Sequence, residues 1–459
     1  MGKHEKELDQ SLKFLAKSAI VVLISIFLSK IITYVYRIFV ARWFGPDVYG
    51  TYSLAISVLG LFVFISLLGF DSGLVRFIPF YTTKKEDEKV SYLLKFSFMS
   101  IILSSLLAGI ILFLTAEIIS IRIFHEEKLT LFLQIFSILI PITSIVSFIE
   151  SVLNGYERIG LYSFIENILK NLTNLTFLVL LLLIGIRERA VPISYLLGGI
   201  ITLIISYFIV MKCVFNKNEK RTKLNSAEKK GIKKEFLVYS IPLLFFSVVN
   251  IIFGWIDSFS IGYFKTTTEV GIYNAAMPIA LLLGIAPQLF IKLFFPMISR
   301  EYGANKGENI KELTKQVTKW IILINLPLMI LLFIFPEKFI GILFGEGYEG
   351  AATPLRILLV GFFVFSTFRI SNRLLAMAGK TKILLFDILI AIILNIILNI
   401  ILIPQPAIFG LDNQTGINGA AIATTISNIL LGFLFLFQIN HYFSIYPFRR
   451  KLINVLIFL

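Results

Sequence analysis

The chain has 459 residues, of which 57% are hydrophobic and only 15% are charged. Soluble globular domains are about 45–50% apolar and about 25% charged, and disordered chains are more polar still, so both classes are excluded. The 43 Lys and Arg residues against 28 Asp and Glu residues give a net charge of +15. In a membrane protein this excess collects in cytoplasmic loops and does not indicate nucleic-acid binding. The composition therefore predicts an all-α polytopic membrane protein.

Twelve apolar stretches are long enough to cross a bilayer, which requires about 20 residues. The first is too long for a signal peptide, so we expect it to be retained as a spanning helix. The last is followed by a short hydrophobic tail, a partial thirteenth segment. In chain order the predicted spans are 14–36, 48–70, 92–115, 129–152, 163–186, 190–212, 236–262, 270–294, 317–336, 352–377, 383–403 and 417–441.

Basic residues concentrate in every second loop. Counted from a cytoplasmic N-terminus, the even-numbered loops contain clusters such as Lys84, Lys85 and Lys89. The odd-numbered loops contain few basic residues, for example Arg42. The positive-inside rule therefore predicts a cytoplasmic N-terminus.

The two halves of the chain contain similar segments in the same order. DVYGTYSLAIS (47–57) corresponds to EVGIYNAAMPI (269–279), and the loop LNGYERIGLYSF (153–164) corresponds to LAMAGKTKILLF (375–386). Six helices per half require both halves to have the same orientation, a pattern that many transporters share. The predicted domains are a six-helix lobe over 1–212, a basic cytoplasmic linker over 213–235, a second lobe over 236–445 and the tail over 446–459.

Ionisable residues inside the predicted spans are candidates for a binding site. A charge at the bilayer centre costs at least about 2.5–3.5 kcal/mol, so such residues normally face protein or water. Cations outnumber anions among the deep positions, which favours a cavity for an anionic substrate. Amide side chains would add hydrogen bonds to sugar hydroxyls. The predicted cavity residues are Lys30, Arg37, Asp257, Arg369, Arg373, Asn250, Asn395 and Asn399.

Simpler explanations exist for several of these residues. Asp257 is equally compatible with an interhelical salt bridge, and the Asn residues with hydrogen bonds between helices. Arg369 and Arg373 share one helix face and are equally compatible with an anchor at a helix end. Glu166 and Lys170 are four apart with Glu first, which predicts an internal ion pair rather than a substrate contact.

The residue types that carry catalysis or bind metals are scarce. The chain has three His and one Cys, none with metal-ligand spacing, and no catalytic constellation is recognisable. We therefore expect no enzyme activity, no metal and no cofactor.

The segments RIFVARWFGPDVYGTYSLAIS (37–57) and GFDSGLVRFIPFY (69–81), with the two loops quoted above, resemble the polysaccharide flippases of the Wzx or RfbX type. These belong to the multidrug/oligosaccharidyl-lipid/polysaccharide exporter superfamily, and the resemblance covers most of the chain. It implies two parallel six-helix lobes of the MATE type in the plasma membrane. The implied activity is alternating-access transport of a polyprenyl-diphosphate-linked oligosaccharide to the outer leaflet for cell-surface polysaccharide synthesis.

The resemblance also implies partners. They are membrane lipids, an anionic lipid-linked glycan and proteins of glycan assembly. Coupling to H⁺ or Na⁺ is frequent in the superfamily, and Asp71, Glu150 and Asp257 are the candidates here.

Three alternative functions would each require a sequence feature that can be checked. A multidrug or metabolite exporter of the same superfamily is expected to have an unpaired carboxylate in its first lobe, where the first span instead contains Lys30 and Arg37. A membrane glycosyltransferase or polymerase needs a large outward loop with clustered carboxylates, and none is predicted. A scaffold for glycan assembly would lack a solvated cavity.

Overall fold

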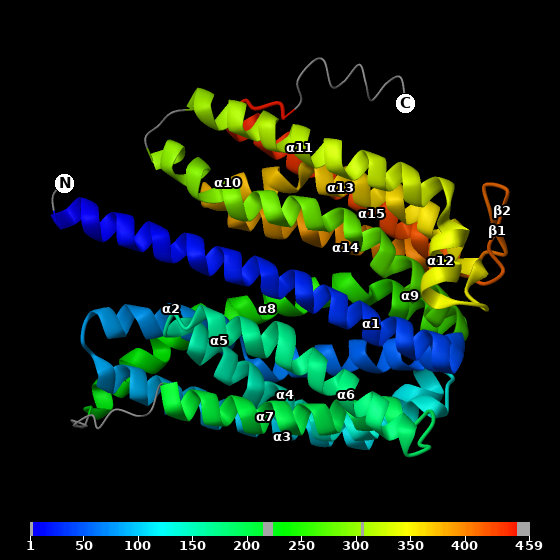
Figure 1. Ribbon diagram of the computed structural model, residues 1–459, viewed down its shortest axis with the longest axis horizontal. Helices are drawn as coiled ribbons and strands as arrows, with labels where there is room; N and C mark the ends of the chain where they lie inside the picture. The colour runs from blue at the N-terminus through cyan, green and yellow to red at the C-terminus, as the bar shows by residue number, and fades with distance from the viewer. Residues whose placement is uncertain (1–2, 214–223, 304–306, 448–459) are drawn as a thin grey trace. The chain divides into compact units, whose positions relative to one another are not determined.

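The computed structural model describes residues 3–213, 224–303 and 307–447 and is helical almost throughout (Figure 1). The predicted all-α class is confirmed. The only strands in the described ranges, β1 (Ala407–Ile408) and β2 (Leu411–Asp412), form a two-residue antiparallel hairpin between the last two helices. The helices before residue 214 are α1 (Lys3–Leu67), α2 (Phe70–Thr83), α3 (Asp87–Glu117), α4 (Lys128–Gly155), α5 (Ile159–Ser163), α6 (Lys170–Leu183) and α7 (Ala190–Cys213), with π-helical turns at η1 (Ile118–Ile123) and η2 (Phe164–Leu169).

The remaining helices follow the same pattern of long apolar segments joined by short connections. They are α8 (Ser226–Phe264), α9 (Thr267–Ala280), α10 (Ile285–Gly303), α11 (Gly307–Ile334), α12 (Pro336–Phe344), α13 (Ala352–Met377), α14 (Thr381–Leu402) and α15 (Ile417–Phe443), with 3₁₀ turns at η3 (Leu281–Gly284) and η4 (Glu349–Ala351).

Eleven helices of the described ranges are long and apolar enough to cross a membrane. One of them, Phe27–Leu67 of α1, includes the end of the first predicted span and most of the second. Gly45 interrupts it with φ 81° and ψ 179°, a conformation that glycine adopts without strain, and Pro46 follows. The two predicted spans are therefore two helical segments that meet directly at a kink at Gly45 and are together labelled α1.

Helix α3 shows why these segments form membrane helices. Its exposed positions are large and apolar, for example Leu103 and Leu114, which are 63% and 70% exposed. Its buried face includes the small residues Ser97, Ser105 and Ala108. Large apolar residues outside and small residues inside are typical of helices that face lipid and pack closely on one another.

The chain divides into two compact units. The first comprises Met1–Phe44 and Thr51–Trp255, and the second comprises Gly45–Gly50 and Ile256–Leu459. In the first, α4 packs on α2, α3 and α7, and α6 packs on α7; in the second, α13 packs on α11 and α15, and α14 packs on α15. The division between the units falls inside α8, whereas the predicted linker ends at residue 235. Residues 214–223 of that linker lie outside the described residues.

The segment of α1 around Gly50, which belongs to the second unit, packs against α9. The contact is made at two glycines, Gly50 and Gly271. A Cβ on Gly50 would lie 1.7 Å from the Thr267 carbonyl oxygen, and one on Gly271 would lie 2.0 Å from that of Pro46. Thr267 precedes Gly271 by four residues, as Pro46 precedes Gly50. The contact is therefore symmetric, and it joins the two segments that the sequence identifies as corresponding.

Candidate functional site

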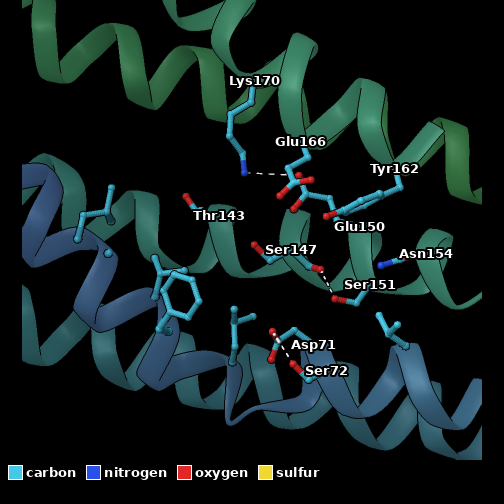
Figure 2. A pocket seen from close by; sticks show the side chains of 16 residues that line it. Asp71, Ser72, Thr143, Ser147, Glu150, Ser151, Asn154, Tyr162, Glu166 and Lys170 are labelled. Atoms are coloured by element: carbon cyan, nitrogen blue, oxygen red, sulfur yellow. Dashed lines mark hydrogen bonds and ion pairs between the residues drawn. The ribbon is translucent and has the colours of Figure 1, made fainter. Parts of the chain in front are cut away.

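A cavity of about 560 Å³ lies within the first unit (Figure 2). Its walls come from α1, α2, α4 and the α5–η2–α6 segment, and its apolar lining includes Phe64 and Leu67. The volume falls within the range of about 300–1,000 Å³ that is typical of small-molecule sites. The polar residues around it are Asp71, Ser72, Thr143, Ser147, Glu150, Ser151, Asn154, Tyr162, Glu166 and Lys170.

The ion pair in this cavity joins α4 to α6. Lys170 Nζ lies 3.4 Å from Glu150 Oε1, and the Glu150 side chain is only 10% exposed. The predicted pair of Glu166 with Lys170 is wrong, because Lys170 pairs with Glu150. Residues Phe164–Leu169 form a π-helix, whose i→i+5 turns displace residues four apart from a common face. The sequence spacing alone assumes a regular α-helix.

Of the remaining carboxylates of the cavity, Asp71 interacts with a neutral group, since Ser72 Oγ donates a hydrogen bond to Asp71 Oδ2 at 3.3 Å. Tyr162 and Glu166 line the cavity together. Among the described residues no cation forms an ion pair with Asp71 or Glu166. The cavity thus contains three carboxylates and a single ammonium group. Two of the predicted coupling residues, Asp71 and Glu150, line it together.

A second polar cluster surrounds Asp257 on α8, in the second unit. Asp257 is 4% exposed. Its Oδ1 accepts a hydrogen bond of 2.9 Å from Asn399 Nδ2, and its Oδ2 accepts bonds from the hydroxyls of Tyr273, at 2.6 Å, and Thr424. Asn395 Nδ2 donates to Thr424 Oγ1 at 3.0 Å, and Asn399 Nδ2 also approaches Asn395 Oδ1 at 3.0 Å. The structure thus brings together Asp257, Asn395 and Asn399, three predicted site residues.

The Asp257 cluster contains no counter-ion among the described side chains, so the alternative of an interhelical salt bridge finds no partner there. Asn399 Oδ1 is buried and accepts no hydrogen bond. A buried carboxylate without a cation is costly, and a buried amide oxygen without a donor adds to that cost. The cluster is therefore a buried carboxylate held by neutral donors, with one amide oxygen left without a hydrogen bond.

The other predicted cavity residues are not part of these two clusters. Lys30 is exposed and Arg37 half-buried on α1, and Arg369 is half-buried and Arg373 exposed on α13. Asn250 is also exposed, and its Nδ2 donates to the Phe246 carbonyl of its own helix at 2.8 Å.

Sequence reasoning missed most of the neutral groups at both clusters. Ser147, Asn154 and Tyr162 carry no spacing signal, since small polar residues are common in membrane helices. Tyr273 lies in the repeated segment 269–279 and Thr424 follows a run of small residues, but neither position marks a contact with α8.

Two family models match the chain. The model described as polysaccharide biosynthesis protein matches residues 15–302, which is more than half of the chain. The chain belongs to this family. A second model, MatE, matches residues 236–401. The apolar helices and the family together make it a multi-pass membrane protein.

Curated relatives are distant in sequence but similar in length. A Shigella flexneri protein described as an O-antigen transporter is 23% identical over 431 residues, which cover 89% of this chain and 93% of that protein. The low-salt glycan biosynthesis flippase Agl15 of Haloferax volcanii is 24% identical over 277 residues, covering 60% of this chain and 54% of that protein.

Solved structures share the fold. The lipid II flippase MurJ in an inward closed conformation has a TM-score of 0.69 at 18% identity, covering 92% of this chain and 87% of that one. An inward-facing MATE multidrug transporter has a TM-score of 0.72 at 15% identity, covering 93% of this chain and 98% of that one. The predicted MATE-like fold is confirmed.

Proposed function

We propose that this protein is a flippase that moves a polyprenyl-diphosphate-linked oligosaccharide from the inner to the outer leaflet for cell-surface polysaccharide synthesis. The observation that carries the proposal is a polar cavity of about 560 Å³ among membrane helices of a polysaccharide biosynthesis family member. The relatives described as an O-antigen transporter and a glycan flippase support it. The protein acts as a transporter and not as an enzyme.

The proposal includes a mechanism and a topology. Two lobes, 1–212 and 236–445, joined by the linker 213–235, alternate between inward and outward access in the plasma membrane. The N-terminus is cytoplasmic, as the distribution of basic loops favours. Membrane lipids surround the lobes, and glycan-assembly proteins supply the substrate.

The cations of α1 and α13 are the proposed contacts for the diphosphate. Arg binds phosphate oxygens in a bidentate manner and Lys acts as a point charge, so Lys30, Arg37, Arg369 and Arg373 suit an anionic headgroup. Asn250 is proposed to contribute a neutral contact.

The test is reconstitution into proteoliposomes with a polyprenyl-diphosphate-linked oligosaccharide and measurement of its exposure on the outer leaflet. We expect the wild-type protein to accelerate exposure, and Lys30→Ala, Arg37→Ala and Arg369→Ala each to slow it by about tenfold, which corresponds to one lost charged contact. Unchanged rates in all three variants would reject the cationic contacts. No acceleration by the wild-type protein would reject the flippase.

Coupling to H⁺ or Na⁺ through Asp257 forms part of the proposal. Its support is the buried carboxylate without a described counter-ion and the Asn399 amide oxygen without a donor. Asp71 and Glu150 are the corresponding candidates in the first unit.

One observation favours a second candidate function, export of organic cations. Asp71 and Glu166 line the first unit's cavity and form no ion pair with a described residue, which is the feature expected of a cation exporter. Uptake of tetraphenylphosphonium into inverted vesicles, abolished by Glu166→Gln, would rank this function first.

A further inference from the structure

The cavity of the first unit has the wrong charge for a diphosphate. Its one ammonium group, on Lys170, is already paired with Glu150 at 3.4 Å. Asp71 and Glu166 add two more carboxylates to its walls. Phosphate binding needs cations that are not neutralised by nearby anions. The diphosphate of a lipid-linked glycan is therefore repelled here.

The same lining suits sugar hydroxyls. Carboxylate oxygens accept charge-assisted hydrogen bonds from O–H donors, and such bonds are stronger than neutral ones. Ser151 and Asn154 offer further donors and acceptors beside them, and Ser147 lines the cavity one turn before Ser151. Phe64 and Leu67 also line the cavity and provide apolar surface on which the C–H face of a sugar ring can pack. Apolar lining with a few convergent polar groups is typical of small-molecule sites.

The backbone turns one of these carboxylates toward the others. Glu166 lies within the π-helical turn η2, and Figure 2 shows it together with Glu150 and Tyr162 beside Lys170. Single π-turns inside α-helices occur frequently at functional sites, because the wider turn redirects side chains. In this protein the turn releases Glu166 from Lys170, so that its carboxylate can accept a hydrogen bond from a ligand.

We propose that this cavity is the glycan subsite and that it selects sugars that carry no carboxylate. The inference rests on the proposed flippase function and specifies which part of the substrate enters the first unit. The hydroxyls of a neutral sugar donate to Asp71, Glu150 and Glu166. A uronic acid would bring a fourth carboxylate into a site of low dielectric, where repulsion between like charges is strong.

The test compares two probes in proteoliposomes. One is a polyprenyl-diphosphate-linked trisaccharide of neutral hexoses, and the other ends in a uronic acid but is otherwise identical. We expect the wild-type protein to expose the neutral probe at least about tenfold faster, since specificity here comes from like-charge repulsion. Glu166→Gln and Asp71→Asn should each reduce this ratio by about threefold, and the double variant should bring it close to one, because each removes one repelling charge.

The matched control is Glu117→Gln, which removes an exposed carboxylate of α3 that does not line the cavity. It should leave the ratio unchanged. A wild-type ratio near one would overturn the inference, as would a ratio that persists in the double variant. Because Glu166→Gln and Asp71→Asn are made separately, a loss of folding in one variant would not by itself explain the same change of ratio in both.

Binding of the same probes in nanodiscs separates the two proposals. If the wild-type protein exposes neither probe but binds the neutral one more tightly, and Glu166→Gln removes that preference, the flippase proposal fails and the glycan subsite stands. If it binds both equally or neither, the subsite is overturned. Binding of tetraphenylphosphonium that depends on Glu166, with no preference between the two probes, would also overturn it.

Discussion

At the residue scale the Asp257 cluster shows how a membrane protein stabilises a buried carboxylate with neutral donors. Three side chains from α9, α14 and α15 donate to its two oxygens. Each hydrogen bond to a charged group contributes about 1.5–3 kcal/mol, which offsets part of the cost of burial. In the proposed coupling, an ion or a proton that binds reversibly offsets the remainder.

Asp257→Asn should abolish the dependence of transport on an ion gradient. The substitution keeps the side-chain shape but removes the charge that attracts the ion. Flipping rates measured with and without imposed Na⁺ and H⁺ gradients should differ in the wild-type protein and agree in the variant. Asp412→Asn, which changes an exposed residue of the β-hairpin, is the control and should retain the gradient response. A persistent response in Asp257→Asn would exclude this site from coupling.

The Glu150–Lys170 pair should behave as a coupled unit. Lys170→Met leaves a nearly buried carboxylate without its partner, and we expect a loss of about 3 kcal/mol in the free energy of unfolding. Adding Glu150→Gln should recover most of this loss, since no buried charge then remains. Unfolding of detergent-solubilised protein in denaturant measures both. Additive effects of the two substitutions would contradict the pairing of these residues across α4 and α6.

At the scale of elements the close contact between α1 and α9 depends on two glycines. A Cβ at either position would lie within 2.0 Å of a backbone oxygen of the other helix. Backbone atoms cannot rotate away, so the helices must separate. Gly50→Ala and Gly271→Ala are each expected to lower the free energy of unfolding by about 2–3 kcal/mol.

The control for this contact is Gly231→Ala on α8, where an added Cβ meets nothing within 4 Å. There the substitution should stabilise by about 0.5–1 kcal/mol through helix propensity alone. The free energies of unfolding of the three variants are compared by thermal unfolding. Equal behaviour of all three would mean that the close approach is not a structural requirement.

The elements also show where sequence patterns suffice. The length of the apolar stretches alone predicts where the observed long helices lie, because a membrane helix needs little more than continuous hydrophobicity. It does not reveal that η2 is a π-turn, since the residues Phe164–Leu169 are as apolar as their neighbours. That one inserted position changes the partner of Lys170 from Glu166 to Glu150.

At the scale of the whole molecule the orientation in the membrane is open to a direct test. Cys213, the single cysteine of the chain, is exposed at the end of α7 and is predicted to be cytoplasmic. A membrane-impermeant maleimide should label it in inverted vesicles and not in intact cells. Gln414→Cys in a Cys213→Ser background, in a loop predicted to face outward, should show the reverse. The opposite pattern would place the N-terminus outside.

The sequence by itself determined the membrane class, the approximate spans, the internal correspondence and the family resemblance. These follow from composition, segment length and the order of motifs, all of which are local or additive properties of the chain. Only the tertiary structure decided which polar residues meet. Asp257 joins Asn399 from 142 positions away, and Glu150 joins Lys170 across two helices. The physical reason is that contacts depend on how each packed helix is rotated about its axis. A helix that is apolar on every side has no polar face in its sequence from which that rotation could be predicted.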